Sequence, residues 1–200
     1  MVEPPRHLVL IKHARPVVTP GTAPTAWPLS AQGQTDCALL AARLRHYRPA
    51  RIVSSDERKA RETAQLLARH LAFIGDLASI PGLREHARTP ADFFPTQAAF
   101  EAAVRDLFAH PDTLVFGQET ANQAHARFTT AIEQLLADTP AGDLLVVAHG
   151  TVLTLFAAPY AGGDPFTFWQ QLSLPAFIAL ALPDLRPIEI VFALDAHGDA

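Results

Sequence analysis

The sequence reads His7-Leu8-Val9-Leu10-Ile11-Lys12-His13-Ala14-Arg15 at its first apolar segment. The run His7–Ile11 is aliphatic, includes β-branched residues and is too short for a helix, so it predicts a central buried strand. Polar residues follow it at once. A second such run, Leu-Leu-Val-Val-Ala within 143–148, is followed directly by His149 and Gly150. The two runs predict a buried sheet with polar groups beyond the ends of its strands.

Segments of helical periodicity alternate with the short strands. Helices are predicted from Ser30 to about Tyr47, from Asp56 onward, over 96–109 and 119–137, and after Gly150. Strands are predicted at 7–11, 51–54, 143–148, 176–182 and 188–194. The region 80–117 is the least patterned, includes a loop over 88–95, and is expected to cover a site. Its part over 88–117 is expected to shape specificity. The alternation predicts a single α/β domain over 1–200, with three α/β/α layers and a mostly parallel central sheet.

The composition narrows the classes of protein to which the chain can belong. Its 200 residues are 49% hydrophobic and 18% charged, which suffices for one sizeable core. A formal net charge of -4 gives no general attraction to nucleic acid or to an acidic membrane surface. Any anionic ligand must therefore be held by a local cluster of cations.

Cysteine usage and hydropathy indicate the cellular location that we expect for the protein. Cys37 is the only cysteine, which excludes an internal disulfide and a thiolate zinc site and favours a reducing, cytoplasmic location. The N-terminus lacks the order of a signal peptide, and no stretch approaches the ~18 apolar residues of a membrane span. We expect a soluble protein that binds neither nucleic acid nor membrane.

Three of the predicted strands are followed directly by polar side chains or by a helix that carries one. In open α/β sheets, ligands bind beyond the carboxyl ends of the strands. The first strand is followed by Lys12 and His13, the second by a helix that carries Lys59, and a later one by His149. We expect these side chains to meet at one edge of the sheet.

Four blocks of sequence carry a family resemblance. They are Ile11-Lys12-His13-Ala14, the stretch from Ser54 to Ala64, Leu83-Arg84-Glu85, and Val146-Val147-Ala148-His149-Gly150. In this order they resemble the histidine phosphatase superfamily, which includes the cofactor-dependent phosphoglycerate mutases. The family has Arg-His-Gly in the first block and Ser-Ser-X-X-X-Arg-Ala-X-X-Thr-Ala in the second. Lysine replaces both arginines here, and Ala14 replaces the glycine of the first block. The Gly-X-Trp-Glu-Gly that often follows the third block is missing. The resemblance implies a phosphoglycerate mutase-like fold.

The resemblance and the chemistry of phosphoryl transfer together assign roles. A neutral imidazole is a good nucleophile near neutral pH, which suits His13 to accept the phosphoryl group. Negative charge on the transferring group would be stabilised by Lys12, Lys59 and His149. The leaving alkoxide needs a proton, and Glu85 is the candidate for this general acid and base work. The predicted catalytic residues are His13, Glu85 and His149.

The phosphate-binding cations are unusual in type. Lys12 and Lys59 are the only lysines among 16 lysine and arginine residues, and both stand where the resemblance requires a cation. Lysine keeps the charge but lacks the bidentate fork of arginine. Arg15 is therefore expected to supply a bidentate contact, in preference to Arg58. Thr151 is expected either to offer its backbone N–H to phosphate or to cap its helix.

Other candidate residues receive structural interpretations. Glu119 and Arg127 are interpreted as structural partners, and Trp27 and Trp169 as packing residues. The remaining histidines are interpreted as surface or satisfied core residues; they are His7, His46, His70, His86, His110, His125 and His197. No close metal-ligand spacing and no Gly-X-X-X-X-Gly-Lys loop occurs, so we predict no metal, no cofactor and no NTPase activity.

The sequence therefore predicts a metal-independent phosphatase of the histidine acid phosphatase type. It would hydrolyse a small phosphorylated substrate through a phosphohistidine on His13, with Lys12, Lys59, Arg15 and Thr151 binding phosphate. Two alternatives stay open. One is a weak or inactive homologue that binds a phosphorylated ligand or a protein partner, which the two lysines and Ala14 motivate. The other is a mutase-type phosphotransferase built on the same core. The substrate and the oligomeric state are not predicted.

Overall fold

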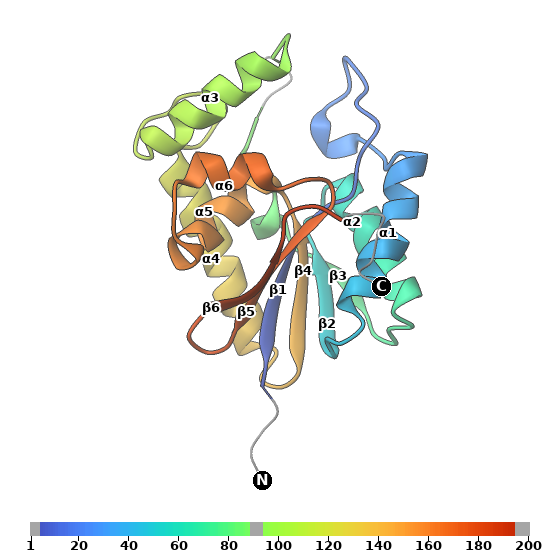
Figure 1. The fold of residues 1–200 in the computed structure, drawn as a ribbon. Coiled ribbons are helices and arrows are strands. Elements are labelled where there is room, and N and C mark those ends of the chain that lie inside the picture. The colour runs from blue at the N-terminus through green and yellow to red at the C-terminus, as the bar shows by residue number, and fades with distance from the viewer. Residues whose placement is uncertain (1–4, 89–93, 195–200) are drawn as a thin grey trace.

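The first apolar run lies in the middle of a six-stranded sheet. The computed structural model describes residues 5–88 and 94–194, and the strand order within them is β3-β2-β4-β1-β5-β6 (Figure 1). The strands are β1 (His7–Lys12), β2 (Pro49–Ser54), β3 (Leu77–Ser79), β4 (Asp143–Ala148), β5 (Ala176–Ala181) and β6 (Arg186–Val191). β1 to β4 are parallel, whereas β5 and β6 extend the sheet in antiparallel pairing. The predicted mostly parallel sheet is confirmed.

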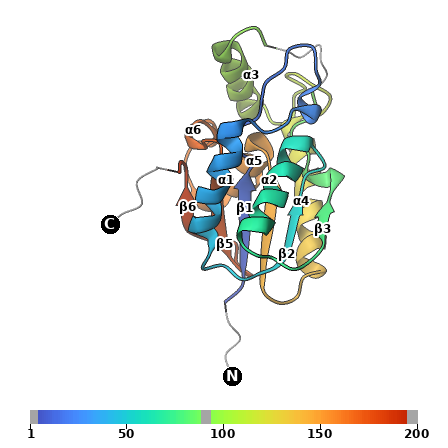
Figure 2. The same cartoon turned by 90° about the vertical axis from the view of Figure 1, so that its right-hand side faces the viewer.

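Helices cover both faces of this sheet, as predicted. They are α1 (Ala31–Leu44) and α2 (Arg58–His70) on one face and α4 (Ala121–Ala137) and α5 (Gly150–Ala161) on the other (Figure 2). The side chains of β1 alternate between the two layers, because successive residues of a strand point to opposite faces. Val9 and Ile11 are buried with the first pair of helices, and Leu8 and Leu10 with the second.

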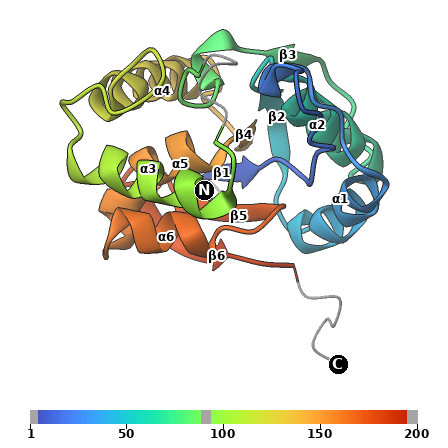
Figure 3. The same cartoon turned by 90° about the horizontal axis from the view of Figure 1, so that it is seen from above.

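Two further parts of the chain rise above the carboxyl edge of the parallel strands. On one side α3 (Gln97–Ala109) contacts α6 (Pro165–Gln171), and on the other the loop with the 3-10 turn Pro24–Ala26 contacts α2 (Figure 1, Figure 3). Both stand over the edge at which the candidate site residues are expected. Thr96 and Thr120 cap α3 and α4, which confirms the helices predicted over 96–109 and 119–137.

Two helix boundaries differ from the predictions. α1 ends at Leu44 rather than near Tyr47, and α2 begins at Arg58 rather than at Asp56. Asp56 does not cap α2, because its carboxylate pairs with the guanidinium of Arg84, with 2.6 Å between Oδ1 and Nε. The helix therefore starts at Arg58, two residues after the predicted start at Asp56.

Two short elements are not predicted by the sequence pattern. β3 has only three residues with partly exposed side chains, and α6 has only seven residues, so neither shows a readable periodicity. The loop predicted over 88–95 lies partly outside the described residues. Among the helices that the structure describes, none is long and apolar enough to cross a membrane.

A buried carboxylate holds the opposite, amino-terminal edge of the sheet together. Asp143 is 5% exposed, and its Oδ1 accepts a hydrogen bond from the backbone N of His7 at 2.9 Å and lies 2.8 Å from Nδ1 of that residue. Its Oδ2 accepts a hydrogen bond from the backbone N of Arg48 at 2.6 Å. Asp143 thus joins the start of β4 to β1 and to the segment before β2.

Asp143→Asn should destabilise the fold without changing the candidate site, which lies at the opposite edge of the sheet. One oxygen becomes an amide donor that faces a backbone N–H, so we expect the free energy of unfolding to fall by about 1 to 3 kcal/mol. Urea denaturation followed by circular dichroism measures this change. An unchanged midpoint with an unchanged slope would show that these hydrogen bonds contribute nothing to stability.

Candidate active site

The strand ends bring the predicted residues into one cleft. β1 and β4 are parallel neighbours with Lys12 opposite Ala148, so the residues that follow, His13 and His149, stand side by side. Their ring centroids are 5.1 Å apart. Lys12, His13 and His149 line a cleft of about 780 Å³, together with Arg15, Lys59 and Glu85. The expectation that Lys12, His13, Lys59 and His149 meet at one edge of the sheet is confirmed. Glu85, which the family resemblance contributed, lines the same cleft.

His13 is held as a neutral imidazole with one nitrogen available. Its Nδ1 donates a hydrogen bond to the backbone oxygen of Ala14 at 2.8 Å, and this acceptor fixes the proton on Nδ1. Burial lowers the pKa of His13 well below its ordinary value of 6.5, and the charges of His149 and Lys59 act in the same direction. The lone pair therefore resides on Nε2. Thr63 steadies the loop, because its Oγ1 accepts from the backbone N of Ala14 at 3.0 Å.

Lys12 projects its ammonium to the same cleft from the end of β1. Its Nζ donates a hydrogen bond to the backbone oxygen of Leu172 at 2.6 Å. Burial lowers the pKa of Lys12 to about 8, against the opposing charge of Glu85. A β-carbon at Gly150 would lie 3.3 Å from Nζ of Lys12, so the glycine leaves room for the ammonium.

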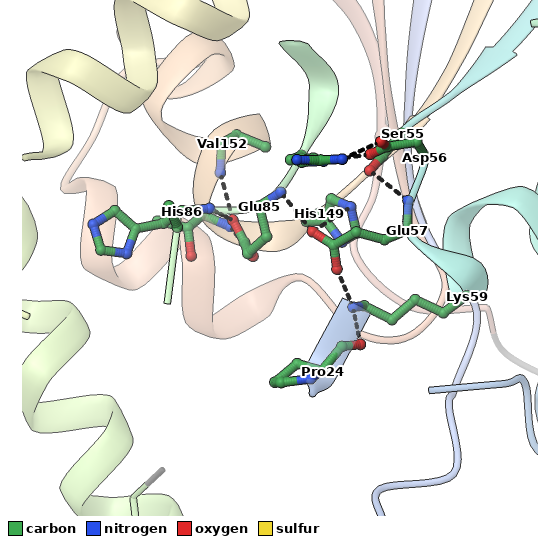
Figure 4. Close-up of polar contacts among 12 residues, drawn as sticks. Pro24, Ser55, Asp56, Glu57, Lys59, Glu85, His86, His149 and Val152 are labelled. Carbon is green, nitrogen blue, oxygen red and sulfur yellow. Dashed lines mark hydrogen bonds and ion pairs between the residues drawn. The ribbon is translucent and has the colours of Figure 1, made fainter. Parts of the chain in front are cut away.

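Lys59 is buried and has two partners. It is 6% exposed, and its Nζ donates to the backbone oxygen of Pro24 at 2.9 Å and to the carboxylate of Glu57 (Figure 4). Sequence reasoning missed Glu57, because it occupies a position that the family block leaves unspecified. The only signal in the sequence is an acidic residue two positions before a required cation. The two lysines thus line the same cleft with different anchoring.

Glu85 lines the cleft with a carboxylate held by backbone groups. Its Oε1 accepts hydrogen bonds from the backbone N of His86 at 2.9 Å and of Val152 at 3.3 Å (Figure 4). Its Oε2 accepts one from the backbone N of Thr151 at 3.1 Å. A carboxylate oxygen offers two lone pairs, so Oε1 is filled while Oε2 keeps one.

Glu119 and Arg127 brace the segment that carries Glu85. The two side chains form an ion pair with 2.6 Å between Oε1 and Nη2. The guanidinium of Arg127 also donates to three backbone oxygens, those of Gly82, Arg84 and Glu85. Neither side chain lines the cleft. Their interpretation as structural partners agrees with these contacts.

His149 has a buried ring without a hydrogen-bond partner among the described residues. It is 1% exposed, and neither of its ring nitrogens forms a hydrogen bond within that part of the chain. Its closest acidic neighbour is Glu57, with 3.5 Å between Nε2 and Oε1. Burial lowers the pKa of His149 well below 6.5, and the charge of Lys59 acts in the same direction. A buried polar group of this kind is available to a ligand.

This arrangement agrees with a comparison against known families. The model of the histidine phosphatase superfamily (branch 1) matches residues 8–179, which contain all four blocks. The chain belongs to this superfamily. A comparison with curated proteins found no match.

Solved structures of similar fold include several phosphatases. A mycobacterial glucosyl-3-phosphoglycerate phosphatase is 21% identical, with a TM-score of 0.72 over 95% of this chain and 100% of its own. YhfR of Bacillus stearothermophilus is 20% identical, with a TM-score of 0.69 over 93% and 96%. The alpha-ribazole phosphatase of Shigella flexneri is 19% identical, with a TM-score of 0.68 over 97% and 100%. These similarities establish the fold of this superfamily member.

Two expectations about phosphate contacts need correction or refinement. The backbone N–H of Thr151 is bound by Glu85, Thr151 does not line the cleft, and the N-cap position of α5 is His149. Thr151 therefore neither presents its N–H to phosphate nor caps the helix, because the helix end is already occupied by a carboxylate. Arg15 lines the cleft with an exposed side chain. Arg58 does not line it and pairs with Glu62 at 2.7 Å.

Part of the cleft lining is aromatic. Phe94, Phe100 and Trp169 line it, with ring centroids of Phe100 and Trp169 5.6 Å apart. The guanidinium of Arg88 lies over Phe100 at 4.8 Å. Trp27 lines the same cleft from the loop beside α2, so Trp27 and Trp169 are wall residues as well as packing residues. The described residues contain no group of three or more His, Cys, Asp or Glu placed to hold a metal ion.

Proposed function

We propose that this superfamily member is a metal-independent phosphomonoesterase that works through a phosphohistidine on His13. The observation that carries the proposal is the state of His13, a neutral imidazole with its proton fixed on Nδ1 and its ring on the wall of the cleft. Nε2 is then a nucleophile that needs no base to activate it. Lys12, Lys59 and His149 line the same cleft and supply donors for the phosphoryl oxygens.

The proposed reaction has two steps, transfer of the phosphoryl group to His13 and hydrolysis of the phosphohistidine. Nε2 of His13 attacks phosphorus, the bond from phosphorus to the alcohol oxygen breaks, and that oxygen takes a proton from Glu85. Oε2 of Glu85 is the atom suited to carry this proton, since Oε1 already accepts two backbone N–H groups. Glu85 then takes a proton from water, which attacks phosphorus. The bond to Nε2 breaks, its electron pair returns to the imidazole, and orthophosphate leaves.

The size of the cleft supports a substrate larger than phosphate. A cleft of about 780 Å³ lies in the range of pockets that enclose a small organic molecule. The alcohol would lie between the aromatic wall of α3 and α6 and the loop that carries Trp27. Two structural relatives are named as a glucosyl-3-phosphoglycerate phosphatase and an alpha-ribazole phosphatase, which agrees with a small phosphorylated substrate.

The test is to trap the intermediate. The wild-type protein is mixed with 32P-labelled phosphomonoester and quenched within milliseconds, and we expect acid-labile, alkali-stable label on the protein together with released orthophosphate. Retained phosphate affinity without label or turnover across a broad panel of phosphomonoesters would overturn the enzyme and support a phosphate-binding homologue. Transfer of the label to an added alcohol rather than to water would instead identify a phosphotransferase.

Deprotonation of Lys12 should lower the activity at alkaline pH. The ammonium is the form that binds phosphate, and burial brings the pKa of Lys12 to about 8, so kcat/KM should fall as the pH rises through that value. A bound phosphate dianion favours the ammonium, so the fall in kcat should begin at higher pH than the fall in kcat/KM. The pH profiles with p-nitrophenyl phosphate measure both limits. Lys12→Arg should lack this alkaline limb, whatever its level of activity, because a guanidinium stays charged.

A flat profile would contradict this assignment. If wild-type kcat/KM is constant from about pH 7.5 to about pH 9.5, the charge of Lys12 does not contribute to phosphate binding. A limb that persists unchanged in Lys12→Arg would place the responsible ionisation on another group.

A further inference from the structure

One buried carboxylate connects three of the four family blocks. Glu57 is 4% exposed and does not line the cleft. Its Oε2 pairs with the ammonium of Lys59, and its Oε1 accepts a hydrogen bond from the backbone N of Glu85 at 3.0 Å. The same Oε1 lies 3.5 Å from Nε2 of His149 (Figure 4). Glu57 therefore contacts the phosphate cation, the proposed acid and the second histidine from behind the cleft wall.

The position of Glu57 at the start of α2 is itself fixed. Its backbone N donates to Oγ of Ser55 at 3.2 Å, and its backbone oxygen accepts from the N of Ala60 and of Arg61 in the first turn. Glu57 occupies the N-cap position, but its side chain forms no capping hydrogen bond with this helix. The carboxylate is thus directed inward, toward Lys59, rather than along the helix end.

A lysine at position 59 needs such a partner more than an arginine would. Its ammonium is a compact charge on a flexible four-carbon stem, whereas a guanidinium is pre-organised for bidentate contact. Glu57 and the backbone oxygen of Pro24 take two of the three N–H groups of Lys59. These two contacts hold the nitrogen between α2 and the loop, and the third N–H remains for an anion in the cleft.

We propose that Glu57 is a positioning residue that makes Lys59 serve as a phosphate-binding cation. This inference rests on the proposed phosphatase function. Glu57 acts through Lys59 and does not touch the substrate, because it lies outside the cleft lining. Its negative charge also balances the buried ammonium while the cleft holds no anion. A buried charge without a partner is strongly unfavourable.

Coupling between the two side chains distinguishes this role from a structural one. In Lys59→Ala, the carboxylate of Glu57 stays buried without its partner, beside His149, where it repels the incoming phosphate. In Glu57→Gln, a neutral amide replaces the carboxylate, so Lys59 loses the opposing charge and only one acceptor oxygen remains for the two N–H donors of Lys59 and Glu85. In the double variant both the cation and the repelling charge are gone. The double variant should therefore be more active than Lys59→Ala alone.

The experiment is a double-mutant cycle on the full chain. With p-nitrophenyl phosphate, we expect Glu57→Gln to lower kcat/KM about tenfold, and Glu57→Gln with Lys59→Ala to exceed Lys59→Ala by about three- to tenfold. Orthovanadate affinity, measured as inhibition, should follow the same order. Asp143→Asn is the matched control, since it also removes a buried carboxylate but at the far edge of the sheet. It should lower stability and leave kcat/KM unchanged.

Two results would overturn the proposal. One is a double variant whose loss equals the product of the two single losses, because independent effects mean that Glu57 does not act through Lys59. The other is a Glu57→Gln variant that loses stability alone, as Asp143→Asn does. If the wild type hydrolyses no phosphomonoester, the proposed phosphatase function fails separately. The cycle is then measured as orthophosphate affinity by calorimetry, and the same order of variants decides whether Glu57 positions Lys59.

Discussion

His13→Ala should lose turnover of p-nitrophenyl phosphate by about ten-thousandfold or more. Removal of the nucleophile leaves only the binding and electrostatic contributions of the site, and such losses are among the largest that single substitutions cause. The label trapped by rapid quench should disappear as well, because no other described group combines a fixed tautomer with a place on the cleft wall. Steady-state kinetics and the quench experiment measure the two losses independently.

His7→Ala is the matched control for this variant. His7 is the first residue of β1, at the opposite end from His13, which follows the strand, and His7 contacts Asp143. We expect normal kcat and normal labelling with some loss of stability. Retained label in His13→Ala would move the nucleophile to another residue, and His149 would be the next to test, since its ring lies 5.1 Å from that of His13.

Glu85→Gln should separate the two chemical steps. A nitrophenolate leaves without a proton, so the first step should survive, whereas attack of water on the phosphohistidine loses its base. With p-nitrophenyl phosphate we expect a burst of nitrophenol equal to the amount of enzyme, followed by turnover slowed by about a hundred- to ten-thousandfold. An alkyl phosphate, whose leaving oxygen needs a proton, should show no burst. Stopped-flow absorbance and product analysis measure these phases.

Glu119→Gln controls for the structural cost of losing a carboxylate in this region. The side chain of Glu119 also accepts a backbone N–H, that of Ala87 at 2.9 Å, but does not line the cleft. It should lose stability and show no burst. Equal losses in both steps for Glu85→Gln, with both substrates, would assign Glu85 to positioning and require another acid.

In the proposed phosphate site, the contacts of the two lysines would compensate for the loss of the arginine fork. Lys12 is anchored by a backbone oxygen and has a pKa lowered by burial, whereas Lys59 is anchored by a carboxylate. Both anchors restrict a flexible stem, which partly replaces the rigidity of a guanidinium. We infer that the pocket retains its cationic function with a different means of orientation.

Several features of the fold and the site were predictable because they depend on local sequence. The apolar runs before His13 and His149 predict strands, and the polar residues that follow are placed at the carboxyl edge by the geometry of parallel sheets. The helices over 96–109 and 119–137 are predicted by the sequence, and the structure adds that Thr96 and Thr120 cap them. The start of α2 was not predicted correctly, because Asp56 pairs with Arg84, which is 28 residues away in the chain.

Other features depend on which distant residues meet. The sequence by itself determined the α/β class, the layer pattern and the superfamily resemblance, because each follows from short-range patterns. It also predicted that Lys12, His13, Lys59 and His149 meet, because they follow strands whose carboxyl ends share one edge of the sheet. Only the tertiary structure decided that Glu57 holds Lys59, and that the N–H of Thr151 belongs to Glu85, a residue 66 positions away in the chain. Burial and hydrogen-bond partners set the protonation state of His13, and neither is encoded in a local stretch of sequence.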